Sequence, residues 1–272
     1  MRGERVRFRR PLRCHARGKG HRTHQDIHRR PDDRTVRGGS ALSDLTYADY
    51  LRMETLLSLQ EPRAPHTAGR AVVLAEQFFI ITHQSCELWL KQLAADLDAA
   101  VESLVPPCDP HDLELGLEFL LRAADIVRVL QQQVLVLEKL PLRCFAAFRP
   151  HLGTASGAQS TQFRRLTALL GNEHDPGSLY EAFTAAADYH GQTVPDVCRR
   201  GVESGVLHRV AEALVDLGNG YWHWKVAHLA LVSGMVGEQS GTGGSSGVDF
   251  LARRTSRPFP ELRRSRGKVR PS

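Results

Sequence analysis

Helical periodicity in three long stretches is the feature that most constrains the fold. Apolar residues recur at three- and four-residue spacing over residues 70–103, 111–140 and about 206–236, as the buried face of a helix requires. Prolines follow the first two stretches, where they would end the helices. No polar–apolar alternation of useful length is present, so strands are not expected. We predict an all-α protein in which the long helices form a bundle.

An amphipathic helix is also predicted over residues 45–60. Tyr47, Tyr50, Leu51 and Leu57 recur there at the spacing of helical turns, so these side chains would share one face. Two prolines follow this segment and would separate it from the next helix.

Shorter helices are predicted near 161–170, 178–189 and 195–201. Residues 150–160 are mostly small and polar, which predicts a loop, and the sequence GTGGSSG at 241–247 predicts a flexible one. The chain contains no internal repeat, and the segments therefore belong to one set of helices rather than to a repeat array.

Charge is concentrated at the two ends of the chain. Residues 1–38 contain 13 Lys and Arg against 4 Asp and Glu, residues 253–272 contain 8 against 1, and the body between them contains 15 against 25. A nucleic-acid groove would need basic residues across the folded part. The overall charge of +6 is therefore not evidence for such a groove, and we predict no nucleic-acid binding.

The composition also predicts the domain boundaries. Residues 1–40 mix Arg, His, Gly and Asp without apolar periodicity, and such a segment cannot bury enough apolar surface to offset the entropy of ordering. We predict a disordered basic extension over residues 1–40, one domain over residues 41–263 and a basic tail over residues 264–272. A polyanion-binding arm is the functional alternative for the extension.

The cellular compartment is predicted from cysteines and hydropathy. Five scattered cysteines form no C-x-x-C pair, which favours a reducing environment over a disulfide framework. The chain has no signal-peptide apolar core and no apolar stretch of 18 residues. We expect a cytoplasmic protein without a membrane span.

His83 is the first candidate for chemistry. Helical spacing places Phe79 one turn before it and Glu87 one turn after it. An aromatic wall beside one hydrogen-bonding ring suits an aromatic ligand with one polar atom. A buried histidine with a purely structural role is the alternative.

His228 is the second candidate, with Trp224 one turn before it and Leu231 one turn after it. Haem iron takes an imidazole as axial ligand and its macrocycle needs apolar walls, so this pattern is that of a haem ligand on a helix. His223 competes for the role, and periodicity alone does not choose between the two.

The glycine-rich segment 241–247 is the third candidate. Its backbone could approach a ligand closely, and the Thr242 hydroxyl could add a hydrogen bond. The G-x-x-x-x-G-K-[ST] and G-x-G-x-x-G patterns are absent, so nucleotide binding is not favoured. A plain linker is the alternative.

Arg149 is the fourth candidate because it follows Phe145 and Phe148 at the start of the small-residue loop. A guanidinium with apolar neighbours can grip a carboxylate through two hydrogen bonds. Ser156 and Gly157 lie a few residues further on and could meet a propionate or a carboxylate.

These segments, in this order, resemble the tryptophan 2,3-dioxygenase family over about residues 44–263. The hydrolase motif H-E-x-x-H is absent. The segments that carry the resemblance are LTYADYLRMETLLSLQ, FFIITHQSCELWLKQL, FRPHLGTASGAQSTQFR, HLALVSGMVGEQSGTGGSSGVDFL and PFPEL. The distance from His228 to Thr242 also agrees with the family, and on this ground His228 is preferred to His223.

The resemblance implies an all-α fold that holds haem b, with ferrous iron, between helices and assembles as a homotetramer, a dimer of dimers. By the same resemblance His228 would be the axial ligand of the iron, while Ser156 and Gly157 would lie at the haem edge. The domain over residues 41–263 would then be a haem-binding dioxygenase domain.

The resemblance also implies the substrate contacts. His83 would be the catalytic residue and would hydrogen-bond the indole N–H, Phe79 and Phe145 would line the ring pocket, and Arg149 and Thr242 would bind the amino-acid end. The helix with Tyr47, Tyr50 and Leu51 would complete the pocket of a neighbouring subunit.

The implied reaction adds both atoms of O₂ across the indole C2–C3 bond of L-tryptophan and gives N-formyl-L-kynurenine, the first step of tryptophan catabolism by the kynurenine route. Ala158 stands where the family usually has phenylalanine, and Phe145 and Phe163 stand where some members have tyrosine. The alternatives are a haem-dependent monooxygenase or hydroxylase of a modified tryptophan or tyrosine, and a haem-binding sensor without catalysis.

Overall fold

The computed structural model describes residues 45–237, 240–244 and 246–269, and within these ranges it contains helices and turns but no strand. The prediction of an all-α protein is confirmed. The predicted extension over residues 1–40 lies outside the described residues, as do residues 270–272 of the predicted basic tail. No helix in the described ranges is both long and apolar enough to cross a membrane.

The chain divides into two units, Met1–Leu51 and Arg52–Ser272, which we describe separately. The described part of the first unit is helix α1 (Tyr47–Leu51), and the second unit begins with α2 (Met53–Leu57). The prediction of one continuous helix here was wrong, because Arg52 has a left-handed backbone with φ of 53°. Neither short helix has a buried residue, and helices of this length depend on packing for their stability.

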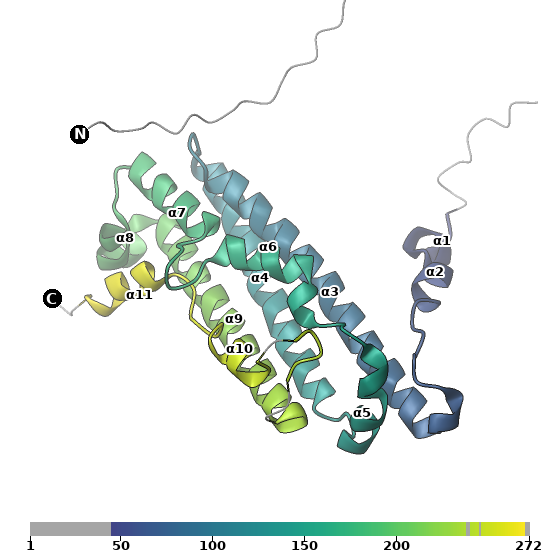
Figure 1. The fold of residues 1–272 in the computed structure, drawn as a ribbon. Helices are drawn as coiled ribbons and strands as arrows, with labels where there is room; N and C mark the ends of the chain where they lie inside the picture. Colours follow the sequence, from purple (N-terminus) through teal and green to yellow (C-terminus); the bar gives the residue numbers. More distant parts are fainter. Residues whose placement is uncertain (1–44, 238–239, 245, 270–272) are drawn as a thin grey trace, which may run out of the picture. The chain divides into compact units, whose positions relative to one another are not determined.

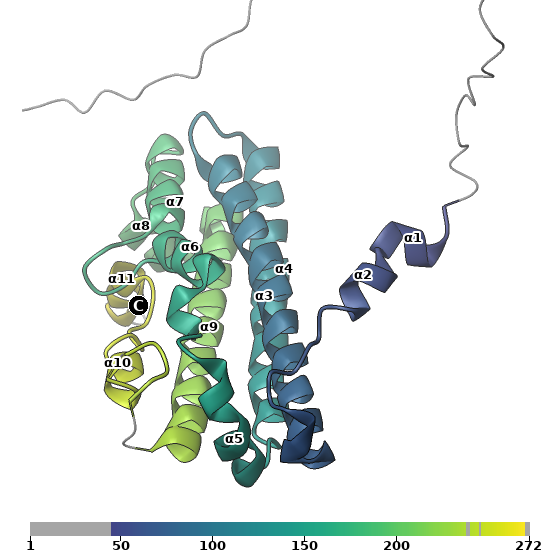
Figure 2. The same cartoon turned by 45° about the vertical axis from the view of Figure 1, so that its right-hand side comes forward.

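Three long helices run side by side in the second unit (Figures 1 and 2). They are α3 (Arg70–Leu104), α4 (Pro110–Leu137) and α9 (Val206–Val236), and their bounds confirm the predicted stretches to within a few residues. Helix α4 packs against both α3 and α9. It is therefore the common support for residues on the other two.

The start of α4 follows directly from the sequence. The Asp109 side chain accepts hydrogen bonds from the backbone N–H groups of His111 and Asp112, Asp112 returns a bond to Asp109, and Pro110 occupies the first helical position. Further along, Arg122 donates to the buried carboxylate of Asp96 on α3 over 2.6 and 2.8 Å. Such a two-bond contact fixes how the two helices align.

Shorter helices and 3₁₀ turns connect the long helices and pack against them. They are η2 (His66–Ala68), α5 (Leu142–Phe148), η3 (Arg149–Leu152), η4 (Gly157–Gln159), α6 (Thr161–Leu170), α7 (Ser178–Tyr189), α8 (Val194–Arg200) and η5 (Gly201–Ser204). Both views place α5 at one end, with the start of α3 and the end of α9, and α7 and α8 at the other (Figures 1 and 2). The predicted loop at 150–160 thus contains two 3₁₀ turns.

Two C-terminal helices were not predicted, α10 (Val248–Ala252) and α11 (Pro260–Gly267). Helix α11 is polar apart from Leu262, which is fully buried together with Phe259 just before it. The ring of Phe259 lies against Gly218 on α9, where an added Cβ would come within 3.2 Å of it. The absence of a side chain at Gly218 therefore makes room for this ring.

Candidate functional site

His83 lies on α3 and is held by the residue one turn before it. Its Nδ1 is 2.8 Å from the carbonyl oxygen of Phe79, and the two rings are 4.0 Å apart, centre to centre. Because a carbonyl oxygen can only accept, Nδ1 carries the hydrogen and, in the neutral ring, Nε2 is an acceptor. Desolvation lowers the pKa of His83 although its side chain remains open to solvent, which favours this neutral form.

Phenylalanine rings form a wall beside His83. The centre of the Phe79 ring lies 6.1 Å from that of Phe145 and 5.5 Å from that of Phe148, and Phe145 meets Phe148 edge-on at 5.4 Å. Phe145 and Phe148 are buried in the core. The structure therefore brings His83, Phe79 and Phe145 together, and it adds Phe148, which the sequence marked only as a neighbour of Arg149.

His228 lies on α9, and its partly buried ring is neutral at physiological pH. Desolvation, with a further contribution from the charge of His83, lowers the pKa of His228 to about 4. The side chain of the competing His223 is exposed and its ring lies 5.0 Å from that of Trp222. Of the two candidates, His228 is the one whose pKa responds to the charge of His83.

The glycine-rich segment packs on the small-residue loop. The Thr242 hydroxyl donates to the carbonyl oxygen of Ala155 over 2.5 Å, and a Cβ added to Gly243 would lie 2.8 Å from the Cβ of Ser156. A glycine is therefore required at 243 for this approach. These contacts tie the segment to the small-residue loop, which a plain linker would not need.

Arg149 joins the same group of loops. Its Nη2 donates to the carbonyl oxygen of Ser240 over 2.6 Å, so the guanidinium lies at the start of the glycine-rich segment. The third and fourth candidates, which are about 90 residues apart in the chain, thus meet in space. The sequence could not indicate this contact, because the partners of Arg149 and Thr242 are backbone carbonyls that every residue carries.

Ser156 and Gly157 form a short turn beside these loops. The Ser156 hydroxyl accepts a hydrogen bond from the backbone N–H of Ala158, and the side-chain oxygen of Gln159 accepts one from the backbone N–H of Ser156. This arrangement is a capping box. No atom lies within 4 Å of a Cβ added to Gly157. The turn is held from within, and its Gly157 edge is open.

The donors in this region suit a metal held in a macrocycle. A neutral imidazole is the form that binds a metal, and haem iron needs only axial ligands from the protein. His228 has the neutral imidazole that such a ligand requires. In the described part of the chain no group of three or more His, Cys, Asp and Glu is placed to hold a bare ion.

Tyr47, Tyr50 and Leu51 belong to the first unit. They lie on α1, and all three side chains are exposed.

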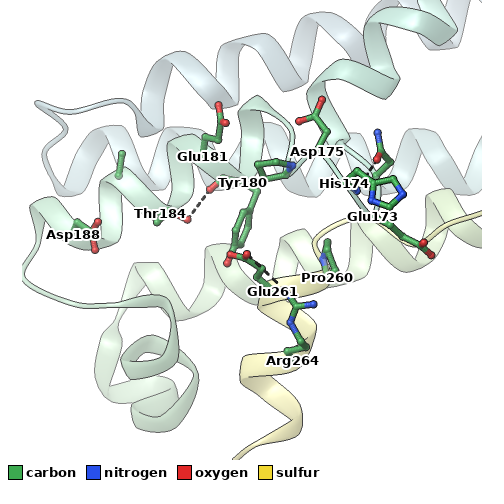
Figure 3. Close-up of a pocket in the computed structure, with 13 residues that line it drawn as sticks. Glu173, His174, Asp175, Tyr180, Glu181, Thr184, Asp188, Pro260, Glu261 and Arg264 are labelled. Carbon is green, nitrogen blue, oxygen red and sulfur yellow. Dashed lines mark hydrogen bonds and ion pairs between the residues drawn. The ribbon is translucent and has the colours of Figure 1, made fainter. Parts of the chain in front are cut away.

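A separate pocket of about 450 Å³ lies between α7, α11 and the segment before α7 (Figure 3). Its lining includes the acidic residues Glu173, Asp175, Glu181 and Glu261. It contains none of the predicted site residues.

Comparison with known proteins identifies the family. A sequence profile described as tryptophan 2,3-dioxygenase matches residues 33–190 and 197–266, which is most of the chain. The chain belongs to the tryptophan 2,3-dioxygenase family. The resemblance expected from the sequence is therefore confirmed.

Relatives of this family match along nearly their whole length. The tryptophan 2,3-dioxygenase of Herpetosiphon aurantiacus is 30% identical over 80% of this chain and 96% of its own. That of Myxococcus xanthus is 33% identical over 80% of this chain and 87% of its own, and that of Kineococcus radiotolerans is 32% identical over 80% and 89%. The tryptophan 2,3-dioxygenase match thus includes all the candidate residues of the second unit.

Proposed function

We propose that this protein is a haem-dependent tryptophan 2,3-dioxygenase, which uses O₂ to cleave the indole C2–C3 bond of L-tryptophan and releases N-formyl-L-kynurenine. The observation that carries the proposal is a partly buried, neutral His228 within electrostatic range of His83, whose ring lies beside Phe79, in a member of this family. The comparisons favour this dioxygenase over the monooxygenase alternative.

Haem b would be held by His228 as axial ligand, with Ser156 and Gly157 at its edge. The neutral state of His228 and the open Gly157 edge support this assignment. When bound in the ferrous state, haem would supply the activation of O₂ that no side chain can provide.

His83 would bind the indole end of the substrate. Since its Nδ1 hydrogen is committed to Phe79, the Nε2 lone pair would accept a hydrogen bond from the indole N–H. Phe79 and Phe145 would pack against the ring and exclude water. Together these contacts would orient the C2–C3 bond, and orientation is a large part of what a protein adds to cofactor chemistry.

Arg149 and Thr242 would bind the amino-acid end. Arg149 would pair with the substrate carboxylate through its planar fork of donors, and its bond to Ser240 keeps the guanidinium next to the glycine-rich loop. Thr242 would help to hold the substrate from that loop. A site with an aromatic wall at one end and a cation at the other selects an aromatic amino acid.

We further propose that the protein is a cytoplasmic homotetramer, a dimer of dimers, with residues 41–263 as its haem-binding dioxygenase domain. The exposed side chains of Tyr47, Tyr50 and Leu51 on α1 would then complete the pocket of a neighbouring subunit. Their apolar exposure supports this role, because large exposed apolar side chains commonly mark interfaces.

The direct test starts from purified protein reconstituted with haem. The sample is reduced without air, mixed with L-tryptophan and isotopically labelled O₂, and followed by absorbance and mass spectrometry. A Soret band together with N-formylkynurenine that contains two labelled oxygen atoms is the expected result.

Two other results would contradict the proposal. A product with one labelled oxygen atom and an intact indole ring would replace the dioxygenase with a monooxygenase. The absence of a Soret band after reconstitution would remove the haem assignment itself.

A further inference from the structure

Lys225 on α9 is a cation that the proposed chemistry does not use. Its Nζ donates to the carbonyl oxygens of Arg254 over 2.6 Å and of Ser256 over 2.9 Å, and lies 4.6 Å from the centre of the Tyr221 ring. Among the ion pairs of the described residues none involves Lys225. Two backbone carbonyls and an aromatic face take the place of a counter-ion.

The environment of Lys225 is costly for a charge. Desolvation lowers its pKa to about 8, because a partly buried ammonium loses much of its hydration. Hydrogen bonds from a charged donor are stronger than neutral ones, so the two carbonyls are held firmly. A cation placed here is suited to fastening the backbone of residues 254–256 to α9.

The fastened backbone is a compact turn behind α10. The N–H of Arg254 donates to the carbonyl of Leu251 over 2.9 Å, and the Thr255 hydroxyl donates to the carbonyl of Ala252 over 2.7 Å. These bonds connect the turn that Lys225 contacts directly to α10. Helix α10 begins at Val248, directly after the glycine-rich segment.

Residues 237–256, which we call the strap, contain the glycine-rich segment and are attached to α9 at both ends. The strap leaves α9 after Val236 and returns to the same helix at Lys225, roughly 16 Å back along the axis at 1.5 Å per residue. Between these ends Ser240 contacts Arg149 and Thr242 contacts Ala155.

We propose that Lys225 is a positioning residue, which fixes the return end of this strap and thereby holds Thr242 on the loop of Ala155. The mechanism is purely mechanical: no proton or bond is exchanged. Its relevance to substrate affinity rests on the proposed function, in which Thr242 binds the amino-acid end of tryptophan. The anchoring of the strap itself does not depend on that assignment.

The test compares Lys225→Met, which keeps the length but removes the donor, with Lys225→Arg, which keeps the charge and donors. Lys91→Met, at an exposed lysine on α3, is the matched control. All are studied as haem-loaded proteins by hydrogen–deuterium exchange and by steady-state kinetics with L-tryptophan.

In Lys225→Met we expect faster exchange in peptides that cover residues 240–257, and no change in those from α4. The Michaelis constant for tryptophan should rise about tenfold, as expected when Thr242 loses one hydrogen bond to the charged amino-acid end of the substrate. The turnover number and the Soret band should stay near those of the wild type. Lys225→Arg should restore both readouts in large part, and Lys91→Met should change neither.

Unchanged exchange at residues 240–257 in Lys225→Met would overturn the anchoring. Faster exchange with an unchanged Michaelis constant would overturn its role in positioning Thr242 for substrate. If the wild type does not turn over tryptophan, the proposed function fails, and the exchange of the peptide with Thr242 still decides whether Lys225 holds the strap. Should Lys225→Met not fold, Lys225→Gln is read by the same two criteria.

Discussion

His83 on α3 and His228 on α9 lie close enough for a positive charge on His83 to lower the pKa of His228. The two residues are 145 positions apart, and α4 supports both of their helices. The predictions below test each side of this arrangement.

Replacement of His228 by alanine should abolish stoichiometric haem binding, because it removes the proposed axial ligand. The measurement is the Soret absorbance per protein after reconstitution. His223→Ala is the matched control on the same helix and should bind haem normally, since its side chain faces solvent. A normal spectrum for His228→Ala, or its loss in His223→Ala, would reverse the assignment.

Replacement of Arg149 by alanine should raise the Michaelis constant for tryptophan about 10- to 100-fold, the range expected when a charge-assisted hydrogen bond is lost. Haem content should not change, because Arg149 is not assigned to the cofactor. Steady-state kinetics beside the Soret band check both statements. Arg143→Ala, at an exposed arginine of α5, should behave as the wild type, and equal Michaelis constants for the two variants would contradict the role of Arg149.

Alanine at Gly243 should displace the glycine-rich loop, since the new Cβ would lie 2.8 Å from the Cβ of Ser156. We expect a cost of about 1–3 kcal/mol, as for other overpacked contacts, part of which appears as weaker tryptophan binding. Gly234→Ala is the control on α9, where no atom lies within 4 Å of the new Cβ. That variant should gain about 0.5–1 kcal/mol in the free energy of unfolding, and urea titration separates the two.

The lowered pKa of Lys225 predicts that its own contribution to the free energy of unfolding rises with pH. Its folded value of about 8 lies below the ordinary 10.5, so between these values the unfolded chain binds more protons and the free energy of unfolding increases as pH rises. Burial raises the pKa of Cys86 to about 11 and also raises the pKa values of Cys108 and Cys198, so these thiols act in the opposite direction above about pH 9. Tyr180 and Tyr221, whose pKa values are raised to about 12 by burial, do the same above pH 10. The contribution of Lys225 is therefore measured as the difference between the wild type and a variant that lacks it.

Urea unfolding at pH 8 and pH 9.5 measures this effect. The change in the free energy of unfolding should be more positive for the wild type than for Lys225→Met, which has no titrating group at this position. Equal changes in the two proteins would show that Lys225 titrates with an ordinary pKa.

The long helices could be predicted because their apolar periodicity extends over 28 to 35 residues and their ends carry clear signals, such as Asp109 and Pro110 before α4. Helix α11 could not, because Leu262 is its only buried apolar residue, with Phe259 buried just before the helix. Short amphipathic segments are equally unreliable, as the break at Arg52 shows.

The site divides in the same way. Residue types and family resemblance pointed to His83, His228, Arg149 and Thr242. Three of them, His83, Arg149 and Thr242, bond to the backbone carbonyls of Phe79, Ser240 and Ala155. These carbonyls carry no sequence signal because every residue has one. The exposure of His223 likewise appears only once α9 is placed against its neighbours.

The chain is attached to α9 a second time shortly after residues 254–256. Arg263 donates to the carbonyl of Pro258 over 3.0 Å and to Asn219 on α9 over 2.9 Å. Release of Lys225 would therefore lengthen the closed loop only from 237–254 to 237–258. The entropy of loop closure grows with the logarithm of length, so this extension costs roughly 0.2 kcal/mol. The loop can gain freedom without unfolding the bundle, and its mobility can vary separately from the stability of the protein.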